Sequence, residues 1–249
     1  MKKFIGIVLP FVVVQILIST NIINSYLQAT LATICINIIL AVSLNLITGF
    51  TGQFSLGHAG FMSIGAYICA LILLRFPTLP GFLAGLLAGA VLAALVGILV
   101  GLPTLRLKGD YLAIATLGMS EIIRVILTNL EITNGAAGLS GIPQFVNWFW
   151  LYLFSAGTVL LLVNFLNSSH GRACISIRED EIAAESVGIP VTRYKVIAFT
   201  VGAFCAGIAG GLYASYFYFL KPGTFGFLKS IDVLVIVVLG GMGSMSGSI

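Results

Sequence analysis

The chain consists mainly of long apolar stretches, separated by short segments rich in glycine or in charged residues. A helix needs about 20 predominantly apolar residues to cross the hydrocarbon of a bilayer. Several stretches approach or reach this length, and none of them alternates strictly between polar and apolar residues as a half-buried strand would. We therefore predict about eight membrane segments, at residues 4–19, 26–48, 55–74, 81–101, 111–128, 147–166, 195–220 and 231–249.

Residues 49–60 interrupt this pattern, because they combine glycines with Gln53, Ser55 and His58. Polar backbone is not tolerated against lipid, so such a segment must pack against protein or line a cavity. We predict a broken or re-entrant element here. A hydrogen-bonded structural role for His58 is favoured over a metal-binding or proton-carrying role, because no second histidine lies close by in the sequence.

Small residues recur every four positions in two of the predicted spans. Residues four apart lie on nearly the same face of a helix, and small side chains allow close helix packing in a membrane. The two stripes are Gly85, Gly89, Ala93, Gly97 and Gly101, and then Gly202, Ala206, Gly210 and Ala214. They predict a compact multi-helix bundle rather than a solute-lining surface.

Composition supports a membrane protein. The 249 residues are 59% apolar and 8% charged, with a mean hydropathy of +1.13, whereas soluble domains are about 25% charged. We predict an all-α, polytopic helical bundle that forms a single membrane domain over residues 1–249. Cys35, Cys69, Cys174 and Cys205 lack a paired spacing and are interpreted as buried small apolar residues.

The charge pattern predicts an orientation. Lysine and arginine are enriched in the cytoplasmic loops of membrane proteins, so the net charge of +4 does not by itself suggest nucleic acid. If the N-terminus is cytoplasmic, alternation places residues 102–110 and 167–194 inside. The inner regions then hold eight basic residues, and the outer loops hold three, namely Arg75, Lys221 and Lys229. The segment after Lys2 and Lys3 resembles a signal peptide but lacks a cleavage site, which favours an anchor helix.

The inner segment 167–194 is unusually charged. Eight of the 20 charged residues lie between Arg172 and Lys195. A short helix is predicted over 178–187, with Asp180 as its N-terminal cap and Gly188 followed by Pro190 at its end. Such a helix is too short to be stable alone, so it must be held by the membrane domain or by a partner. An ordinary solvated loop is the alternative.

The order of several motifs resembles one family, the permease subunits of branched-chain amino-acid ABC importers of the LivM type. Together the motifs extend over roughly residues 40–249. They are Gly49-Phe-Thr-Gly-Gln-Phe-Ser-Leu-Gly-His-Ala-Gly60, Gly109-Asp-Tyr-Leu-Ala-Ile-Ala-Thr-Leu-Gly118, Glu121-Ile-Ile-Arg124, Thr133-Asn-Gly-Ala-Ala-Gly-Leu139, Glu181-Ile-Ala-Ala-Glu185 with Gly188, Arg193-Tyr-Lys195, and Gly240-Gly-Met-Gly-Ser244.

The resemblance implies a transport subunit of the inner membrane that works by alternating access. Its expected partners are a second homologous permease, two cytoplasmic ATPase subunits and an extracytoplasmic solute-binding protein. The segment 167–194 would then be the coupling loop that meets an ATPase. The expected coupling residues are Glu179, Asp180, Glu181, Ala183, Ala184, Glu185 and Gly188. Permeases of this kind continue past the last glycine-rich motif, which predicts that the sequence is truncated at its C-terminal end.

Six polar residues are candidates for the translocation pathway: Gln53, Ser55, His58, Thr116, Glu121 and Arg124. Glu121 and Arg124 are three apart in an apolar run and can pair on one helix. A charged group in mid-membrane costs about 2.5–3.5 kcal/mol on insertion scales, which pairing would relieve. Structural pairing is therefore favoured over solute contact.

The sequence has no Gly-x-x-x-x-Gly-Lys-Ser/Thr motif, so we do not expect this chain to bind or hydrolyse ATP. No enzyme active site, cofactor or metal site is predicted; ATP would be used by the partner subunits. The resemblance favours leucine, isoleucine and valine as cargo, whereas the residues alone indicate only a small solute. Urea or amide permeases and an ion- or proton-coupled carrier remain alternatives, and a channel is a weaker one.

Overall fold

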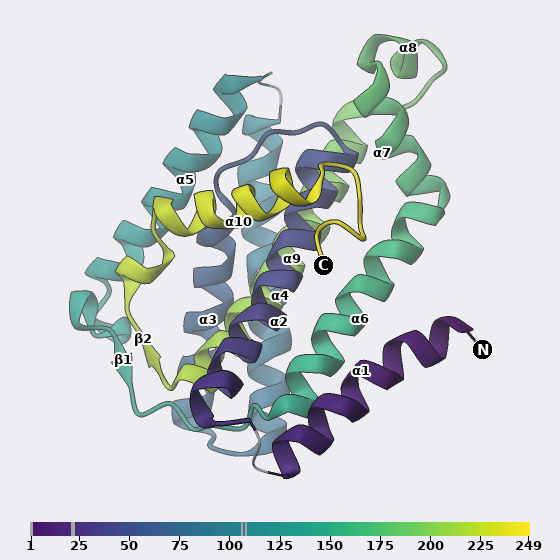
Figure 1. The fold of residues 1–249 in the computed structure, drawn as a ribbon. Helices are drawn as coiled ribbons and strands as arrows, with labels where there is room; N and C mark the ends of the chain where they lie inside the picture. Colours follow the sequence, from purple (N-terminus) through teal and green to yellow (C-terminus); the bar gives the residue numbers. More distant parts are fainter. Residues whose placement is uncertain (1, 21–22, 106, 108) are drawn as a thin grey trace.

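The computed structural model describes residues 2–20, 23–105, 107 and 109–249, and the side chains of residues 2–10 lie outside this description. Arg106 and Lys108, counted above among the inner basic residues, also lie outside the described residues. The described chain is helical apart from short connections and one two-residue strand pair (Figure 1). The predicted all-α membrane bundle is therefore confirmed.

Six helical segments are long and apolar enough to cross a membrane. They comprise α2 (Ser25–Asn45) with the π-helical turn η1 (Leu46–Phe50), α3 (His58–Arg75), α4 (Leu79–Thr104), α5 (Asp110–Asn129), α6 (Trp148–Asn167) and α9 (Val191–Phe217). Helix α1 (Lys2–Ser19) precedes them and contacts α6. The predicted positions of the spans agree with these helices to within a few residues.

The predicted span 231–249 is wrong. Helix α10 (Phe227–Gly240) has 14 residues, and the chain then forms turns to its end. At 1.5 Å per residue such a helix is about 21 Å long, which is short of the ~30 Å hydrocarbon core. Gly241 has a φ of +100° and follows the last turn. In Figure 1, α10 (yellow) lies across the long helices instead of running along them.

The broken element predicted at 49–60 is confirmed. Helix α2 passes into η1, residues 51–57 are not helical, and α3 begins at His58. Gly52 has a φ of +71°, a conformation that side chains other than glycine rarely adopt. The break therefore places several polar backbone groups next to the ends of two buried helices.

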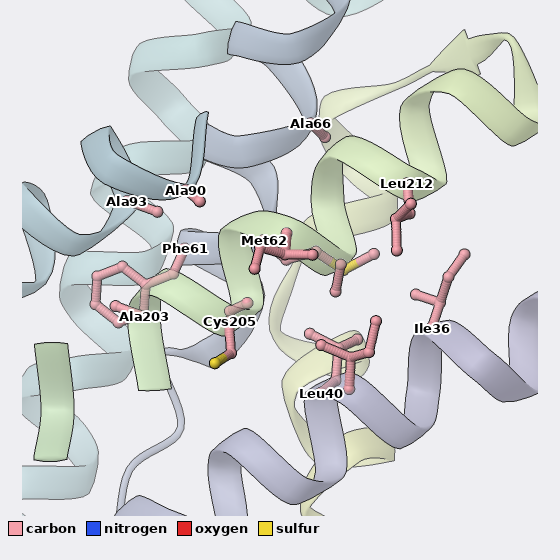
Figure 2. Packing of buried hydrophobic residues seen from close by; sticks show 14 of the residues in the cluster. Ile36, Leu40, Phe61, Met62, Ala66, Ala90, Ala93, Ala203, Cys205 and Leu212 are labelled. Carbon is pink, nitrogen blue, oxygen red and sulfur yellow. The ribbon is translucent and has the colours of Figure 1, made fainter. Parts of the chain in front are cut away.

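The centre of the bundle is built from α3, α4 and α9, which approach one another through small residues. A Cβ added to Gly65 would collide with the backbone of Gly207, and one added to Gly210 would collide with the backbone of Met62. Apolar side chains of α2 complete the core around α9, as Figure 2 shows for Ile36 and Leu40. The close packing predicted from the small-residue stripes is confirmed.

Short elements fix the remaining connections. Strand β1 (Leu139–Ser140) pairs in antiparallel fashion with β2 (Phe219–Leu220), and the turns η2 (Glu131–Thr133) and η3 (Gly135–Ala137) precede β1. The turn η4 (Pro222–Phe225) follows β2. At the other end of the bundle, α7 (Ser169–Glu179) and α8 (Glu181–Ser186) connect α6 to α9. All four cysteines are buried and free, as predicted.

Candidate functional site

The charged segment between α6 and α9 projects beyond the bundle, with α8 at its tip (Figure 1). One helix was predicted over 178–187, but the structure has two, divided at Asp180. Asp180 is extended, with a φ of −155°, and its Oδ1 accepts hydrogen bonds from the backbone N–H groups of Ile182 at 2.9 Å and Ala183 at 3.0 Å. The capping role of Asp180 is confirmed, while Arg178 and Glu179 belong to the preceding helix.

The inner side of α8 is fastened to its neighbours. Ala184 is 4% exposed and packs with Ile177 of α7 and Val191 of α9. The carboxylate of Glu181 lies 2.9 Å from the ammonium of Lys195, at the base of α9. Gly188 has a φ of +85° and allows the chain to turn into α9. Helix α8 is therefore held by its own membrane domain, as its length requires.

The outer side of α8 carries exposed residues of mixed character. Ile182 and Val187 are 74% and 77% exposed, and Ala183 and Glu185 are also exposed. Glu185 lines an open hollow of about 730 Å³ together with Val196 and other residues at the start of α9. Large apolar side chains at this level of exposure, beside an acid, are typical of a surface that contacts another protein.

Arg178 connects α7 to the membrane bundle. Its guanidinium donates a hydrogen bond of 3.0 Å to the backbone oxygen of Gly49 in η1 and forms an ion pair with Glu179. A side chain on Gly243 would meet the same guanidinium. The charged segment, the broken element and the C-terminal glycine-rich motif therefore meet at one arginine.

Asn45 completes this junction, and sequence reasoning missed it. Its side chain accepts a hydrogen bond of 2.9 Å from the N–H of Gly243 and donates one of 2.9 Å to the oxygen of Ser244 and one of 2.7 Å to Ser248. The one available sign of a role for Asn45 was its polar side chain at the end of the apolar segment 25–45. The sequence does not reveal that residues 45 and 243 are neighbours.

The predicted pathway residues divide into two groups. Three of them gather where α3 begins: His58 Nε2 is 2.8 Å from Ser43 Oγ, Thr116 Oγ1 accepts a 3.1 Å hydrogen bond from Leu56, and Ser55 bonds the backbone of Gly57. His58, Ser55 and Thr116 are each 1% exposed. The prediction that His58 is hydrogen-bonded is therefore confirmed. Ser55, His58 and Thr116 form a buried polar cluster at the start of α3. Gln53 lies nearby and donates to the backbone oxygen of Lys195 at 3.3 Å.

Glu121 and Arg124 form the other group. They are paired on α5 at 2.7 Å, and their side chains are about one-third exposed, at 32% and 34%. Both lie beside Gly226, just before α10. The predicted pairing is confirmed, and the pair does not belong to the buried cluster.

Cys174 of α7 lies outside the membrane-spanning helices. Burial raises the pKa of this thiol to about 11, although a hydrogen bond with Thr51 partly opposes the effect. Because the thiolate is the reactive form, Cys174 is unreactive near neutral pH. Among the described residues, no group of three His, Cys, Asp or Glu side chains is placed to hold a metal ion.

The placement of Lys229 in an outer loop is wrong. After β2 the chain turns back into the bundle, where the ring of Phe225 packs against Tyr67 of α3 at a centroid distance of 6.3 Å. Helix α10 therefore starts within the bundle, and Lys229 Nζ donates a 3.0 Å hydrogen bond to Asn37 of α2. This return was not predicted, because the glycines, proline and lysine of residues 221–226 are typical of an exposed turn.

Comparisons with known proteins agree with this architecture. The family model described as branched-chain amino acid transport system / permease component matches residues 26–249. The high-affinity branched-chain amino acid transport system permease proteins LivM of Salmonella typhimurium and Escherichia coli are each 41% identical to the chain over 244 residues, which cover 84% of this chain and 57% of theirs. LivH of Escherichia coli is 27% identical over 240 residues, covering 84% of this chain and 76% of that protein.

The chain therefore spans little more than half the length of the LivM proteins it matches. No solved structure matches it. The family model, however, covers nearly all of the chain, including α2 to α10 and the segment that carries α7 and α8. The chain belongs to the family of permease components of branched-chain amino acid transport systems.

Proposed function

We propose that this chain is a membrane-spanning subunit of an ABC importer, and that it moves branched-chain or other hydrophobic amino acids inward by alternating access. The observation that carries the proposal is α8: its inner side is fastened to α7 and α9, while Ile182 and Val187 at its tip are exposed. An ATP-driven importer subunit without a nucleotide-binding motif needs a partner that hydrolyses ATP, and α8 offers a surface for one.

The proposed route of force runs from α8 into the bundle along two connections. One is the Glu181–Lys195 ion pair to the base of α9. The other is Arg178, which links α7 to Gly49 at the broken end of α2. When a bound ATPase moves α8, α9 and the end of α2 would move with it at the same time. The packing of these two helices against α3 would then differ between the outward and inward states.

The proposed assembly contains two cytoplasmic ATPases, a second homologous permease and an extracytoplasmic binding protein. The Glu121–Arg124 pair supports the second permease, because a partly exposed ion pair on a membrane helix is unfavourable against lipid and favourable against protein or water. The proposed orientation has the N-terminus and α8 in the cytoplasm. A membrane-impermeant thiol reagent applied from outside should label a cysteine at Ser140 and not one at Ser186; the reverse result would invert the topology.

The cargo is proposed from the relatives, whose names specify branched-chain amino acids. A urea or amide permease is the nearest alternative, and uptake assays with radiolabelled leucine and urea distinguish the two. An ion- or proton-coupled carrier is the alternative from another class. It would need several intramembrane acids, whereas Glu121, the acid well inside a span, is already paired with Arg124.

Uptake into membrane vesicles that contain the complete importer tests the proposal. We expect leucine uptake that requires ATP and persists when the proton gradient is collapsed with an uncoupler. Loss of uptake with the uncoupler while ATP is still present would support the carrier and contradict the importer.

A further inference from the structure

Lys229 is a charged residue at an unexpected depth. Its partner Asn37 is at the middle of the 26-residue span Ser25–Phe50, twelve residues after Ser25 and thirteen before Phe50. With this span crossing the bilayer, a lysine held at that position lies near the centre of the hydrocarbon, where an ammonium is unfavourable. Ionisable groups persist at such depths when they pair or when they serve a transported solute.

Within the described part of the chain, no ion pair explains how the charge of Lys229 is tolerated at this depth. The three ion pairs found there involve other residues, so no carboxylate oxygen of this region lies within 4.0 Å of its ammonium. Asp232, one turn further along α10, acts on it electrostatically from an exposed position. An ammonium has three donors, and the bond to Asn37 uses one.

The surroundings of Lys229 are polar on the side of α10 that faces the bundle. The next residue, Ser230, accepts a hydrogen bond of 3.2 Å from the N–H of Ala59 at the start of α3. Gly226, three residues earlier, lies beside Glu121 and Arg124 of α5. The start of α10 thus joins α2 through Lys229 and α3 through Ser230, and the residue just before it lies beside α5.

We infer that Lys229, positioned by Asn37, binds the carboxylate of the amino acid as it passes through the membrane domain. The inference rests on the proposed function, since it takes an amino acid as the cargo. Within the described residues, Asn37 is the one hydrogen-bond acceptor found for the ammonium, and a carboxylate can accept from the two remaining N–H donors. A charge-assisted hydrogen bond is about twice as strong as a neutral one. Asn37 is a positioning residue: it holds the ammonium of Lys229, and the ammonium in turn binds the carboxylate of the solute.

The test uses the complete importer in proteoliposomes, with leucine and its binding protein. Two quantities are measured: ATP hydrolysis stimulated by the loaded binding protein, and leucine delivered per ATP hydrolysed. For Lys229→Gln we expect assembly and stimulated hydrolysis near the wild-type level and at least a tenfold fall in leucine per ATP. Lys229→Arg should restore most of the delivery, because it restores the charge. Lys221→Gln, which removes an exposed lysine of the same region, is the matched control and should behave as wild type.

Asn37→Ala provides a second variant, which keeps the ammonium and removes its support; a several-fold fall in leucine per ATP is expected. The inference is overturned if Lys229→Gln delivers as much leucine per ATP as wild type. It is also overturned if hydrolysis and delivery fall together and arginine gives no rescue, since that result indicates a structural role. Absence of ATP-driven leucine uptake by the wild-type importer would instead refute the proposed function, and this is measured first.

Discussion

Asp180 separates α7 from α8 and caps the first turn of α8. One carboxylate oxygen holds two backbone N–H groups of α8. These donors belong to the first turn of a helix of six residues, where an uncapped end would leave a large fraction of the amides unsatisfied. The cap therefore stabilises the start of α8, in addition to the packing of Ala184 and the Glu181–Lys195 ion pair.

Asp180→Ala should loosen α8 without disturbing the bundle. The loss of an N-cap side chain costs about 0.5–2 kcal/mol. Hydrogen exchange of a peptide covering residues 181–187 should accelerate by about two- to thirtyfold, while peptides of α9 exchange as in wild type. Asp180→Asn keeps an acceptor oxygen and serves as the control. Equal protection in the alanine variant would show that the cap does not stabilise α8.

Sequence reasoning worked at this scale when the signal was local. The cap, the terminating glycine at 188 and the Glu121–Arg124 pair depend on residues a few positions apart, and each was predicted and observed. Asn45 and Lys229 were missed because their partners are about 200 residues away in the chain. Hydrogen bonds of that kind depend on the tertiary fold, which the sequence pattern does not reveal.

At the scale of elements, the small-residue stripes decide how closely α3, α4 and α9 approach. Gly65 lies against Gly207 of α9, and Gly89 lies against Gly65. Lipid tails are as apolar as the buried side chains, so the hydrophobic effect does not drive helices together inside a membrane. Helices that meet backbone to backbone are instead stabilised by dispersion and by complementary shape. The stripes were readable from the sequence, although the partner of each glycine was not.

Gly65→Ala should destabilise the bundle, because the added Cβ has no room beside the backbone of Gly207. A cost of about 1–3 kcal/mol is expected from overpacking. The midpoint of thermal unfolding in detergent should therefore fall by several degrees. Gly157→Ala is the matched control, since no neighbouring atom of the described residues is found within 4 Å of its added Cβ. A midpoint equal to that of wild type in Gly65→Ala would mean that the helices can separate at little cost.

Helix α8 is the element to which we assign the contact with an ATPase. Glu185→Arg reverses a charge at its exposed side and should leave membrane insertion intact. We expect co-purification with the ATPase subunits to fall at least tenfold, together with ATP-driven uptake. Glu131→Arg reverses an exposed acid at the opposite end of the molecule and should retain both. Normal association in Glu185→Arg would argue against the assigned contact.

Across the whole molecule, three segments far apart in the sequence converge at the end that carries α8. Arg178 joins α7 to η1, and Asn45 joins the end of α2 to the C-terminal turns. Residues 167–194 were predicted to lie inside and residues 231–249 to form a span, and neither prediction indicated that these segments touch. The error over residues 231–249 has the same origin, because apolar composition gave no sign that α10 lies across the bundle.

A crosslink at α8 tests the central claim, that an ATPase drives the bundle through this helix. Ser186→Cys places an exposed thiol on α8, while the native cysteines are buried and Cys174 is kept protonated by its raised pKa of about 11. With a cysteine in the facing groove of the ATPase, we expect a disulfide that stops ATP-driven leucine uptake and a return of uptake after reduction. A complex that transports leucine at the wild-type rate while this crosslink fails to form would contradict the account.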